Sequence, residues 1–224
     1  MRGGGGAWRV YQEPAQENRH IAGAEGAGGE AGGEVKPILF SGKLVRAILD
    51  GRKTVTRRPV KPQPFDIVGD DDFSIHALDD DCRQFNIKYP YAVGNILYLR
   101  ETFQKVLIEE DEPADIYGYV YKASPETFED YGVLRDGEEY PLTWRPSIHM
   151  PREAARIFLR VTGVRVERIQ DITETDALAE GFKSIGAFRE YWDTLAMKQR
   201  GADWYTNEWV WVIAFERTEP CPKS

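Results

Sequence analysis

The sequence has few of the residues that build metal centres and disulfide frameworks. It holds three histidines and two cysteines in 224 residues, and the histidines are scattered among loop-like segments. Metal sites use closely spaced histidine and cysteine ligands, and neither an H-x-x-x-H nor a C-x-x-C pair is present. Cys82 and Cys221 lie far apart in the chain. We therefore expect no metal site, no cofactor and no disulfide framework, as is typical of a protein in a reducing cytoplasm.

Long apolar runs are also absent. No stretch of about 18 apolar residues occurs, so the sequence predicts no membrane span and no membrane partner. The N-terminus lacks the apolar segment of a secretory signal, which again favours a cytoplasmic location. What the chain does have is 42% hydrophobic and 12% aromatic residues, enough for one packed core of ordinary domain size.

The two ends of the chain differ in composition from the middle. Residues 1–34 hold 10 of the 21 glycines and few large aliphatic side chains, so they cannot bury enough apolar surface to offset the entropy of ordering. We interpret them as a disordered tail, or as a start upstream of the native one, because the structured pattern begins at Val35. A single domain is predicted over 35–217, followed by a short tail at 218–224.

Apolar periodicity predicts more strands than helices. Strand patterns cover residues 36–40, 53–58, 96–101, 116–121, 157–169 and 208–217. Helix patterns follow Ser41, run from Thr173 to Gly181, and pass through Phe188–Leu195. Crossover helices do not separate the strands regularly, so a doubly wound parallel sheet is disfavoured. The predicted fold class is α+β, a small and mostly antiparallel β-barrel with a few flanking helices.

Two acidic stretches interrupt this pattern. Residues 66–81 contain seven aspartates and little periodicity, and we interpret them as a surface loop. Residues 107–139 contain eleven acidic and two basic residues. Outside the strand at 116–121 they are predicted to be a solvated acidic insertion, which is a candidate surface for a protein partner.

The stretch Gly51–Arg58, with the sequence GRKTVTRR, carries the strongest chemical signal. It is a local basic site on a chain of net charge −8. Its lysine, threonines and arginines suit either an anionic ligand or a nucleophile with its activator, and a solvated basic strand edge is the third interpretation. In a regular strand Thr54 and Thr56 share one face and Lys53 the other. Lys53 can therefore approach Thr56 only from the loop that follows Gly51.

Basic residues gather in two segments of this acidic chain. Residues 43–61 hold seven basic residues and one acidic residue, and residues 145–168 hold six arginines and two acidic residues. If the two segments face each other, they form a basic groove that suits a nucleotide or RNA. The candidate ligand-binding side chains are Thr54, Arg57, Arg58, Arg145 and Glu101, the last with pairing to an arginine as its alternative.

Four blocks of residues stand in a definite order along the chain. They are Gly51–Arg58, Gly94–Glu101, Asp171–Glu174 with Ala179–Gly181, and the closing strand Trp209–Ile213. Together they resemble the ASCH domain family, which is related to the PUA RNA-binding fold. A further block, Trp144–Pro151, resembles the branch found in phages and prophages. The resemblance spans residues 35–217 and implies a PUA-like barrel that binds RNA or a nucleotide in a cleft.

Some bacterial members of this family resemble acetylcytidine amidohydrolases, which remove an acyl group from a modified nucleoside. On that resemblance their catalytic lysine falls on Lys53, their threonine on Thr56 and their glutamate on Glu180. The resemblance implies that Lys53 activates the Thr56 hydroxyl and that Glu180 moves the proton. A ribonuclease activity is also attributed to the family.

Two alternatives to an enzyme remain open. One is a non-catalytic module that binds RNA phosphates through Lys53, Arg57, Arg58 and Arg145. The other is a phage accessory protein that binds a second protein through the acidic insertion.

One departure from the family pattern is Asn95, where many members have aspartate, and it excludes a carboxylate role at that position.

Overall fold

The computed structural model describes most of the chain from residue 34 to residue 219. The described stretches are 34–69, 75–81, 83–109, 116–124, 134–135, 138–139, 143–199 and 203–219. The predicted tails at 1–34 and 218–224 therefore lie almost entirely outside the described residues. The same holds for much of the predicted acidic insertion at 107–139.

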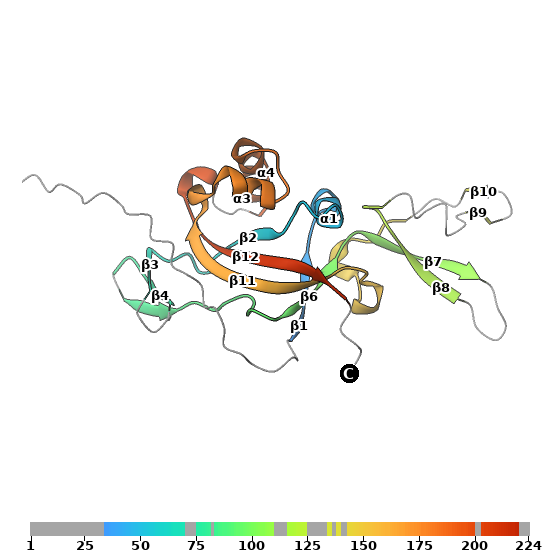
Figure 1. Cartoon of the computed structure of the whole chain (residues 1–224), viewed down its shortest axis with the longest axis horizontal. Coiled ribbons are helices and arrows are strands. Elements are labelled where there is room, and N and C mark those ends of the chain that lie inside the picture. The colour runs from blue at the N-terminus through green and yellow to red at the C-terminus, as the bar shows by residue number, and fades with distance from the viewer. Residues whose placement is uncertain are drawn as a thin grey trace, which may run out of the picture.

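A five-stranded sheet forms the centre of the described structure (Figure 1). Its strands, in order across the sheet, are β1 (Val35–Leu39), β6 (Ile96–Arg100), β11 (Phe158–Arg168), β12 (Trp209–Thr218) and β2 (Val55–Pro59). β1 runs parallel to β6, and the other three pairings are antiparallel. Buried apolar side chains recur along the β11–β12 pair, as expected of strands that pack on a core.

The described residues also form three smaller antiparallel sheets. One contains β3 (Asp66–Gly69), β4 (Ile75–Leu78) and β5 (Gln84–Asn86); the others pair β7 (Phe103–Glu109) with β8 (Ile116–Tyr121) and β9 (Leu134–Arg135) with β10 (Glu138–Glu139). A small apolar cluster lies where β7 and β8 meet the loop that precedes β11. Its buried members are Phe103, Tyr121, Met150 and Ala154.

The β3–β4–β5 sheet corrects a prediction. Residues 66–81, predicted to be a surface loop, contain both β3 and β4. The prediction is wrong because each strand has only four residues, so its alternation is too short to stand out among seven aspartates. Ile67 and Ala77 are paired across the two strands and both are buried, which supplies the cross-strand contact that stabilises the pair.

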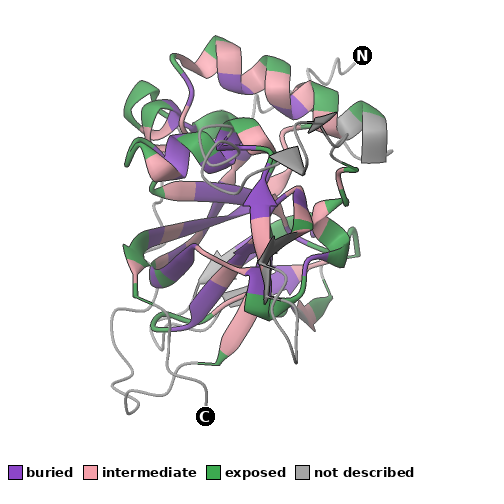
Figure 2. Cartoon of the chain, turned by 90° about the vertical axis from the view of Figure 1, so that its right-hand side faces the viewer, coloured by how far each residue is buried: buried purple, intermediate pink, exposed green. Residues whose placement is uncertain are grey.

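The helices cover one side of the main sheet. Within the described residues the α-helices are α1 (Gly42–Leu49), α3 (Glu174–Ala179) and α4 (Ile185–Gln199), and the single-turn 3-10 helices are η1 (Ser147–His149), η2 (Arg152–Ala154), η3 (Ile169–Asp171) and η4 (Trp204–Thr206). α3 and α4 lie over β2, β12 and β11 (Figure 1), and Figure 2 shows buried, intermediate and exposed positions along the helices. None of the described helices is long and apolar enough to cross a membrane.

Helix α1 follows the sequence pattern closely. Leu44, Val45 and Ile48 are buried, as the 3.6-residue period of apolar positions predicts. Gly51 has φ of 72° and ends the helix in the left-handed conformation that glycine adopts without strain. Ser41 occupies the predicted N-cap position, but its side chain makes no capping hydrogen bond.

The structure confirms an α+β class with mostly antiparallel sheets, but its described strands do not form a closed barrel. The main sheet ends at β1 on one side and at β2 on the other. These edges approach each other, because Arg58 on β2 donates a hydrogen bond from Nη2 to the Leu39 carbonyl on β1 at 3.0 Å. A side chain thus bridges the edges where a barrel would have a ladder of backbone hydrogen bonds. The described sheet is curled and open.

Candidate functional site

Lys53 lies between the end of α1 and the start of β2. The backbone N–H groups of Arg52 and Lys53 both donate to the Ala47 carbonyl, at 2.9 and 3.0 Å. Lys53 then pairs with Glu180 as an isolated β-bridge, and the regular strand begins two residues later, at Val55. The pleat of β2 therefore does not set the direction of the Lys53 side chain.

Glu180 lies at the end of α3, where the local sequence determines the geometry. Thr173 and Asp176 form a capping box at the start of this helix, and Glu180 is its C-cap. Gly181 follows with φ of 87°, and a Cβ added there would lie 2.8 Å from the Cβ of Ala47. Only glycine allows this close approach of α3 to the end of α1, and the approach brings Glu180 beside the residues that follow α1.

The α3 cap is tested by Thr173→Ala, which we expect to lower the free energy of unfolding by about 1 kcal/mol. Partial burial of Asp176 raises its pKa, but hydrogen bonds from Thr173 and the charges of Arg57 and Arg165 outweigh burial and lower the pKa below 3.8. Such a carboxylate stabilises the fold above its unfolded pKa, and the stabilisation is lost as the pH falls through the folded pKa.

In Thr173→Ala the pKa of Asp176 should rise towards its unfolded value, so the acid-induced loss of stability should be smaller and should be complete at a higher pH than in the wild type. Urea unfolding at several pH values measures both effects. Thr194→Ala, at an exposed position of α4, is the control and should change stability by less than about 0.5 kcal/mol. Equal effects of the two substitutions would contradict the capping role.

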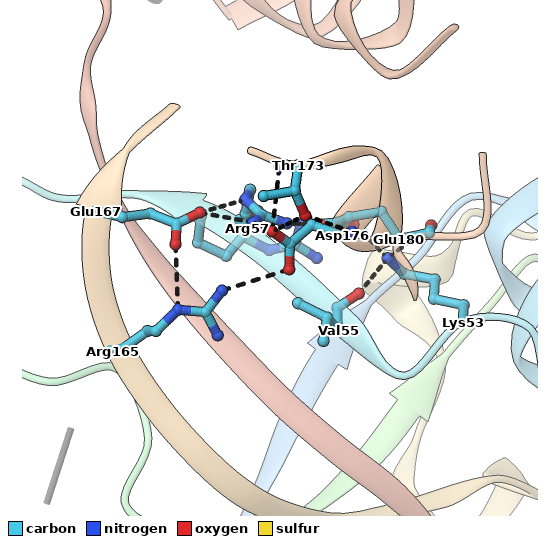
Figure 3. Close-up of polar contacts among 9 residues, drawn as sticks. Lys53, Val55, Arg57, Arg165, Glu167, Thr173, Asp176 and Glu180 are labelled. Atoms are coloured by element: carbon cyan, nitrogen blue, oxygen red, sulfur yellow. Dashed lines mark hydrogen bonds and ion pairs between the residues drawn. The ribbon is translucent and has the colours of Figure 1, made fainter. Parts of the chain in front are cut away.

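Lys53 and Glu180 form a buried ion pair (Figure 3). The Lys53 Nζ donates to Glu180 Oε2 at 2.5 Å, to the Val55 carbonyl at 2.7 Å and to the Glu180 carbonyl at 3.1 Å. Lys53 is 2% exposed and Glu180 3%. All three protons of the ammonium group are thus donated to protein oxygens.

Burial lowers the pKa of Lys53 below 10.5, because the loss of hydration outweighs the attraction of the Glu180 carboxylate. The positive charges of Arg58 and Arg57 lower the pKa further. The amine is therefore easier to deprotonate than a surface lysine.

Arg57 extends the ion pair into a network (Figure 3). Its Nε and Nη2 donate to Glu167 Oε1 on β11 at 2.9 and 2.6 Å, and Glu167 Oε2 accepts from Arg165 at 3.1 Å. Its Nη1 lies 3.5 Å from Glu180 Oε1, and its Nη2 lies 3.5 Å from Asp176. The network balances three cations against three carboxylates: Lys53, Arg57 and Arg165 against Glu167, Asp176 and Glu180.

Two atoms of this network retain unused hydrogen-bonding capacity. Arg57 Nη1 and Glu180 Oε1 are both buried and neither has a hydrogen-bond partner in the described structure. Most buried polar groups in proteins are paired. The two atoms lie 3.5 Å apart and form an ion pair without a hydrogen bond.

The Thr56 hydroxyl lies outside the network. Thr56 is 1% exposed and pairs with Ile213 across the β2–β12 ladder. Strand alternation puts its side chain on the face of β2 that also carries Arg58, opposite to Arg57. Among the described residues no hydrogen bond joins the Thr56 hydroxyl to Lys53 or Glu180. The structure therefore brings the Lys53 and Glu180 side chains together. Thr56 is buried and close to Lys53 in the sequence, but its hydroxyl is not hydrogen-bonded to either side chain.

Two other candidate residues flank this pair. Thr54 is exposed and is held by its backbone, with its N–H on the Ala179 carbonyl at 2.8 Å and its carbonyl accepting from Phe215 at 2.9 Å. Arg58 is half-buried, and its guanidinium lies 5.2 Å from the centre of the Phe40 ring. The Lys53 amine lies 5.4 Å from the centre of the same ring, so both cations contact Phe40.

Glu101 and Arg145 do not join the Lys53 network. Glu101 is buried and accepts a two-point contact from Arg156, at 2.9 and 3.1 Å, which is the arginine pairing considered as its alternative. Arg145 is exposed and forms a backbone bridge with Phe103. No contact between Arg145 and Lys53 is present among the described residues.

Ion pairs inside the protein also reduce the number of cations that are available to line the predicted basic groove. Several of its cations are paired with carboxylates inside the protein: Lys53, Arg57, Arg156 and Arg165. Arg168 stacks on the Trp209 ring at 4.1 Å.

The sequence analysis missed Glu167 and Asp176 as members of the charge network. The available signal was Glu167 beside Arg165 in a strand whose neighbouring positions are buried and apolar.

The comparisons with known proteins do not assign a family. No protein-family model matches the sequence, and no curated protein matches it. A crystal structure of a protein from Enterococcus faecalis V583, of the family DUF984, is similar to 86% of this chain and 84% of its own. The identity is 13% and the TM-score 0.35.

Within the described residues no group of His, Cys, Asp and Glu side chains is arranged to hold a metal ion.

Proposed function

We propose that this chain is an ASCH-type protein with a PUA-like fold that binds RNA or a modified nucleotide and hydrolyses the amide of an acylated cytidine. The observation that carries the proposal is the buried pair of Lys53 Nζ and Glu180 Oε2, 2.5 Å apart, with the buried Thr56 three residues after Lys53. The same three residues are those at which the sequence resembles acetylcytidine amidohydrolases.

A purely structural role explains such a pair poorly. Removing two charges from water is costly, and well-packed apolar residues are often at least as stable in their place. Perturbed titratable groups with a specific charge partner cluster at functional sites. The lowered pKa of Lys53 and the unpaired Oε1 of Glu180 are therefore better explained by proton transfer and ligand contact.

The proposed chemistry begins inside the ion pair. Lys53 gives one proton to Glu180 along their hydrogen bond, which leaves a neutral amine and a carboxylic acid. On substrate binding the amine takes the proton of the Thr56 hydroxyl while Oγ1 forms a bond to the amide carbonyl carbon. The C–N bond then breaks, and the Glu180 proton goes to the leaving exocyclic nitrogen. Water cleaves the Thr56 ester, which releases the acid and restores the hydroxyl.

Thr56→Val tests the proposal because valine has nearly the volume of threonine and lacks the hydroxyl. We expect kcat/KM for acetylcytidine to fall by at least about 100-fold, the usual loss when a nucleophile and its proton transfer are removed. Chromatographic separation of acetylcytidine from cytidine measures turnover, and thermal unfolding should stay close to the wild type. Thr194→Val, at an exposed position of α4, is the control and should retain turnover. Unchanged turnover of Thr56→Val would refute the catalytic role.

One observation favours the non-catalytic alternative. The Lys53 ammonium donates all of its protons to Glu180 and Val55 and has none left for Thr56. A module that only binds RNA requires no approach of Thr56 to Lys53. It would show RNA affinity that falls with salt, together with no turnover by the wild type. The protein-partner alternative concerns the acidic insertion, which lies largely outside the described residues, and it stays a prediction.

A further inference from the structure

Four arginines without a carboxylate partner in the described structure lie near the ends of β1 and β6: Arg145 and Arg152 are exposed, and Arg58 and Arg100 are half-buried. The register places Leu39 of β1 beside Arg100 of β6, and the Phe40 N–H donates to the Arg100 carbonyl at 3.5 Å. The Arg100 guanidinium donates to the Ile148 carbonyl in η1, so the turn that follows Arg145 packs against the end of β6 (Figure 1). We call this the arginine surface and define it as Leu39, Arg58, Arg100, Arg145, Ile148 and Arg152.

The arginines of this surface differ from six other arginines that the structure describes. Arg58, Arg100, Arg145 and Arg152 form no ion pair with any carboxylate in the part of the chain that the structure describes. Other described arginines, by contrast, are held by carboxylates: Arg52, Arg57, Arg83, Arg156, Arg165 and Arg189. On a protein of net charge −8, a group of arginines without carboxylate partners favours a polyanion.

The same surface exposes large apolar side chains. Leu39 is 43% exposed and Ile148 is 58% exposed. A duplex hides the faces of its bases, whereas a single strand presents them to apolar side chains and to arginine planes. The combination of unpaired arginines with exposed aliphatic groups therefore fits a single strand better than a duplex.

The arginine surface is continuous with the Lys53 site. The Lys53 amine and the Arg58 guanidinium both contact the Phe40 ring, at 5.4 and 5.2 Å from its centre. Arg58 in turn donates to the Leu39 carbonyl at 3.0 Å. A series of side-chain contacts thus leads from the buried ion pair to the solvent-exposed turn.

We infer that a single-stranded polynucleotide lies across the arginine surface and delivers one of its nucleotides to the Lys53 site. For the nucleotide that enters the Lys53 site, the inference rests on the proposed function. For the remainder of the polynucleotide, it rests on the charge and the exposure of the arginine surface. It makes the substrate a nucleotide within a strand, with phosphates on Arg100, Arg145 and Arg152. A free nucleoside would leave these arginines unused.

The test compares two triple variants of equal charge change in the full chain. Arg100→Gln, Arg145→Gln and Arg152→Gln together remove three cations of the surface, while Lys61→Gln, Lys88→Gln and Arg217→Gln together remove three exposed cations elsewhere. The probe is a labelled twelve-nucleotide RNA, with a DNA of the same sequence as second probe, followed by fluorescence anisotropy between 50 and about 300 mM salt.

We expect the surface variant to raise Kd at least tenfold and to lower the salt slope by about 0.7 for each phosphate that is no longer bound, while the control set changes Kd less than twofold. A preference for RNA over DNA identifies the 2′-hydroxyl as part of the recognition, and equal binding assigns recognition to phosphate and base alone. Because Arg100 also supports the turn at Ile148, the exposed pair Arg145→Gln and Arg152→Gln is measured as well and should lower the slope by about 1.4.

Equal losses of affinity in the surface and control sets, or tighter binding of an acidic peptide than of either strand, would overturn the inference. The outcome for the proposed function is separate. Arginine-dependent strand binding without turnover of an acetylated cytidine rejects the chemistry and supports the surface. Turnover of free acetylcytidine as efficient as within the strand, and unchanged in the surface variant, rejects the surface and supports the chemistry.

Discussion

Lys53→Met is expected to destabilise the protein by about 3–5 kcal/mol, because it leaves the buried Glu180 carboxylate without its partner. The remaining cation near Glu180 is Arg57, at 3.5 Å and without a hydrogen bond to it. Urea unfolding followed by tryptophan fluorescence measures the change. For the same reason Lys53→Ala is a poor probe of catalysis, since any loss of activity would be mixed with loss of folded protein.

The double variant Lys53→Met with Glu180→Leu separates the cost of burial from the value of the pair. Replacing both charges by apolar groups should recover most of the stability lost in the single variant, to within about 1–2 kcal/mol of the wild type or above it. Additive losses from the two substitutions would show that Lys53 and Glu180 stabilise the fold independently of each other, which would contradict the cost assigned to an unpaired buried charge.

The Lys53 charge also predicts a pH dependence. The folded pKa lies below the unfolded value of 10.5, so between them the unfolded state binds more protons and stability rises with pH. Below the folded pKa the buried charge lowers stability by a constant amount. The double variant should lack this alkaline rise, which a series of unfolding curves would show.

Arg57→Leu is the second substitution with a large expected effect, again about 3–5 kcal/mol, because it leaves Glu167 and Glu180 buried with fewer partners. Arg165→Leu is its matched control. Arg165 contacts the same Glu167 carboxylate but its side chain is 31% exposed, so its loss should cost about 1 kcal/mol or less.

Denaturant unfolding of the two variants under the same conditions decides between a buried network and a surface one. If Arg57→Leu and Arg165→Leu have equal effects, the charges are screened alike. The description of Arg57 as the centre of a buried network would then be wrong.

The parts of the fold that were predicted correctly are those with a strong local signal. The period of Leu44, Val45 and Ile48 predicted α1, and Gly51 marked its end. The capping box of Thr173 and Asp176 predicted the start of α3. These signals lie within a few residues of one another, so the chain needs no tertiary contact to express them.

The parts that were missed depend on pairing between distant segments. The strands within 66–81 are short and acquire their buried face only when Ile67 meets Ala77. The opening between β1 and β2 likewise depends on how far the sheet curls, which no local pattern encodes. Strand alternation predicted which side chains share a face, and left open which face the helices cover.

The candidate site likewise combines residues that the sequence pointed to with contacts between distant segments that it did not predict. The resemblance to known sequences pointed to Lys53 and Glu180, and their contact requires the docking of α3 against α1 that Gly181 allows. Arg57 was expected to reach a ligand, whereas Glu167 and Asp176 hold it inside the protein. No pattern within β2 distinguishes Arg57 from Arg58, because burial of the first is decided by residues more than 100 positions later.

The wide separation of Lys53 and Glu180 along the chain affects the order in which the protein is made. They are 127 residues apart, and β2 pairs with β12, whose residues come later still. A nascent chain therefore carries Lys53 as a hydrated cation until the C-terminal third has left the ribosome. Burial of this charge and completion of the sheet edge belong to the final stage of biosynthesis, so a chain cut short before α3 has no acid to accompany its lysine.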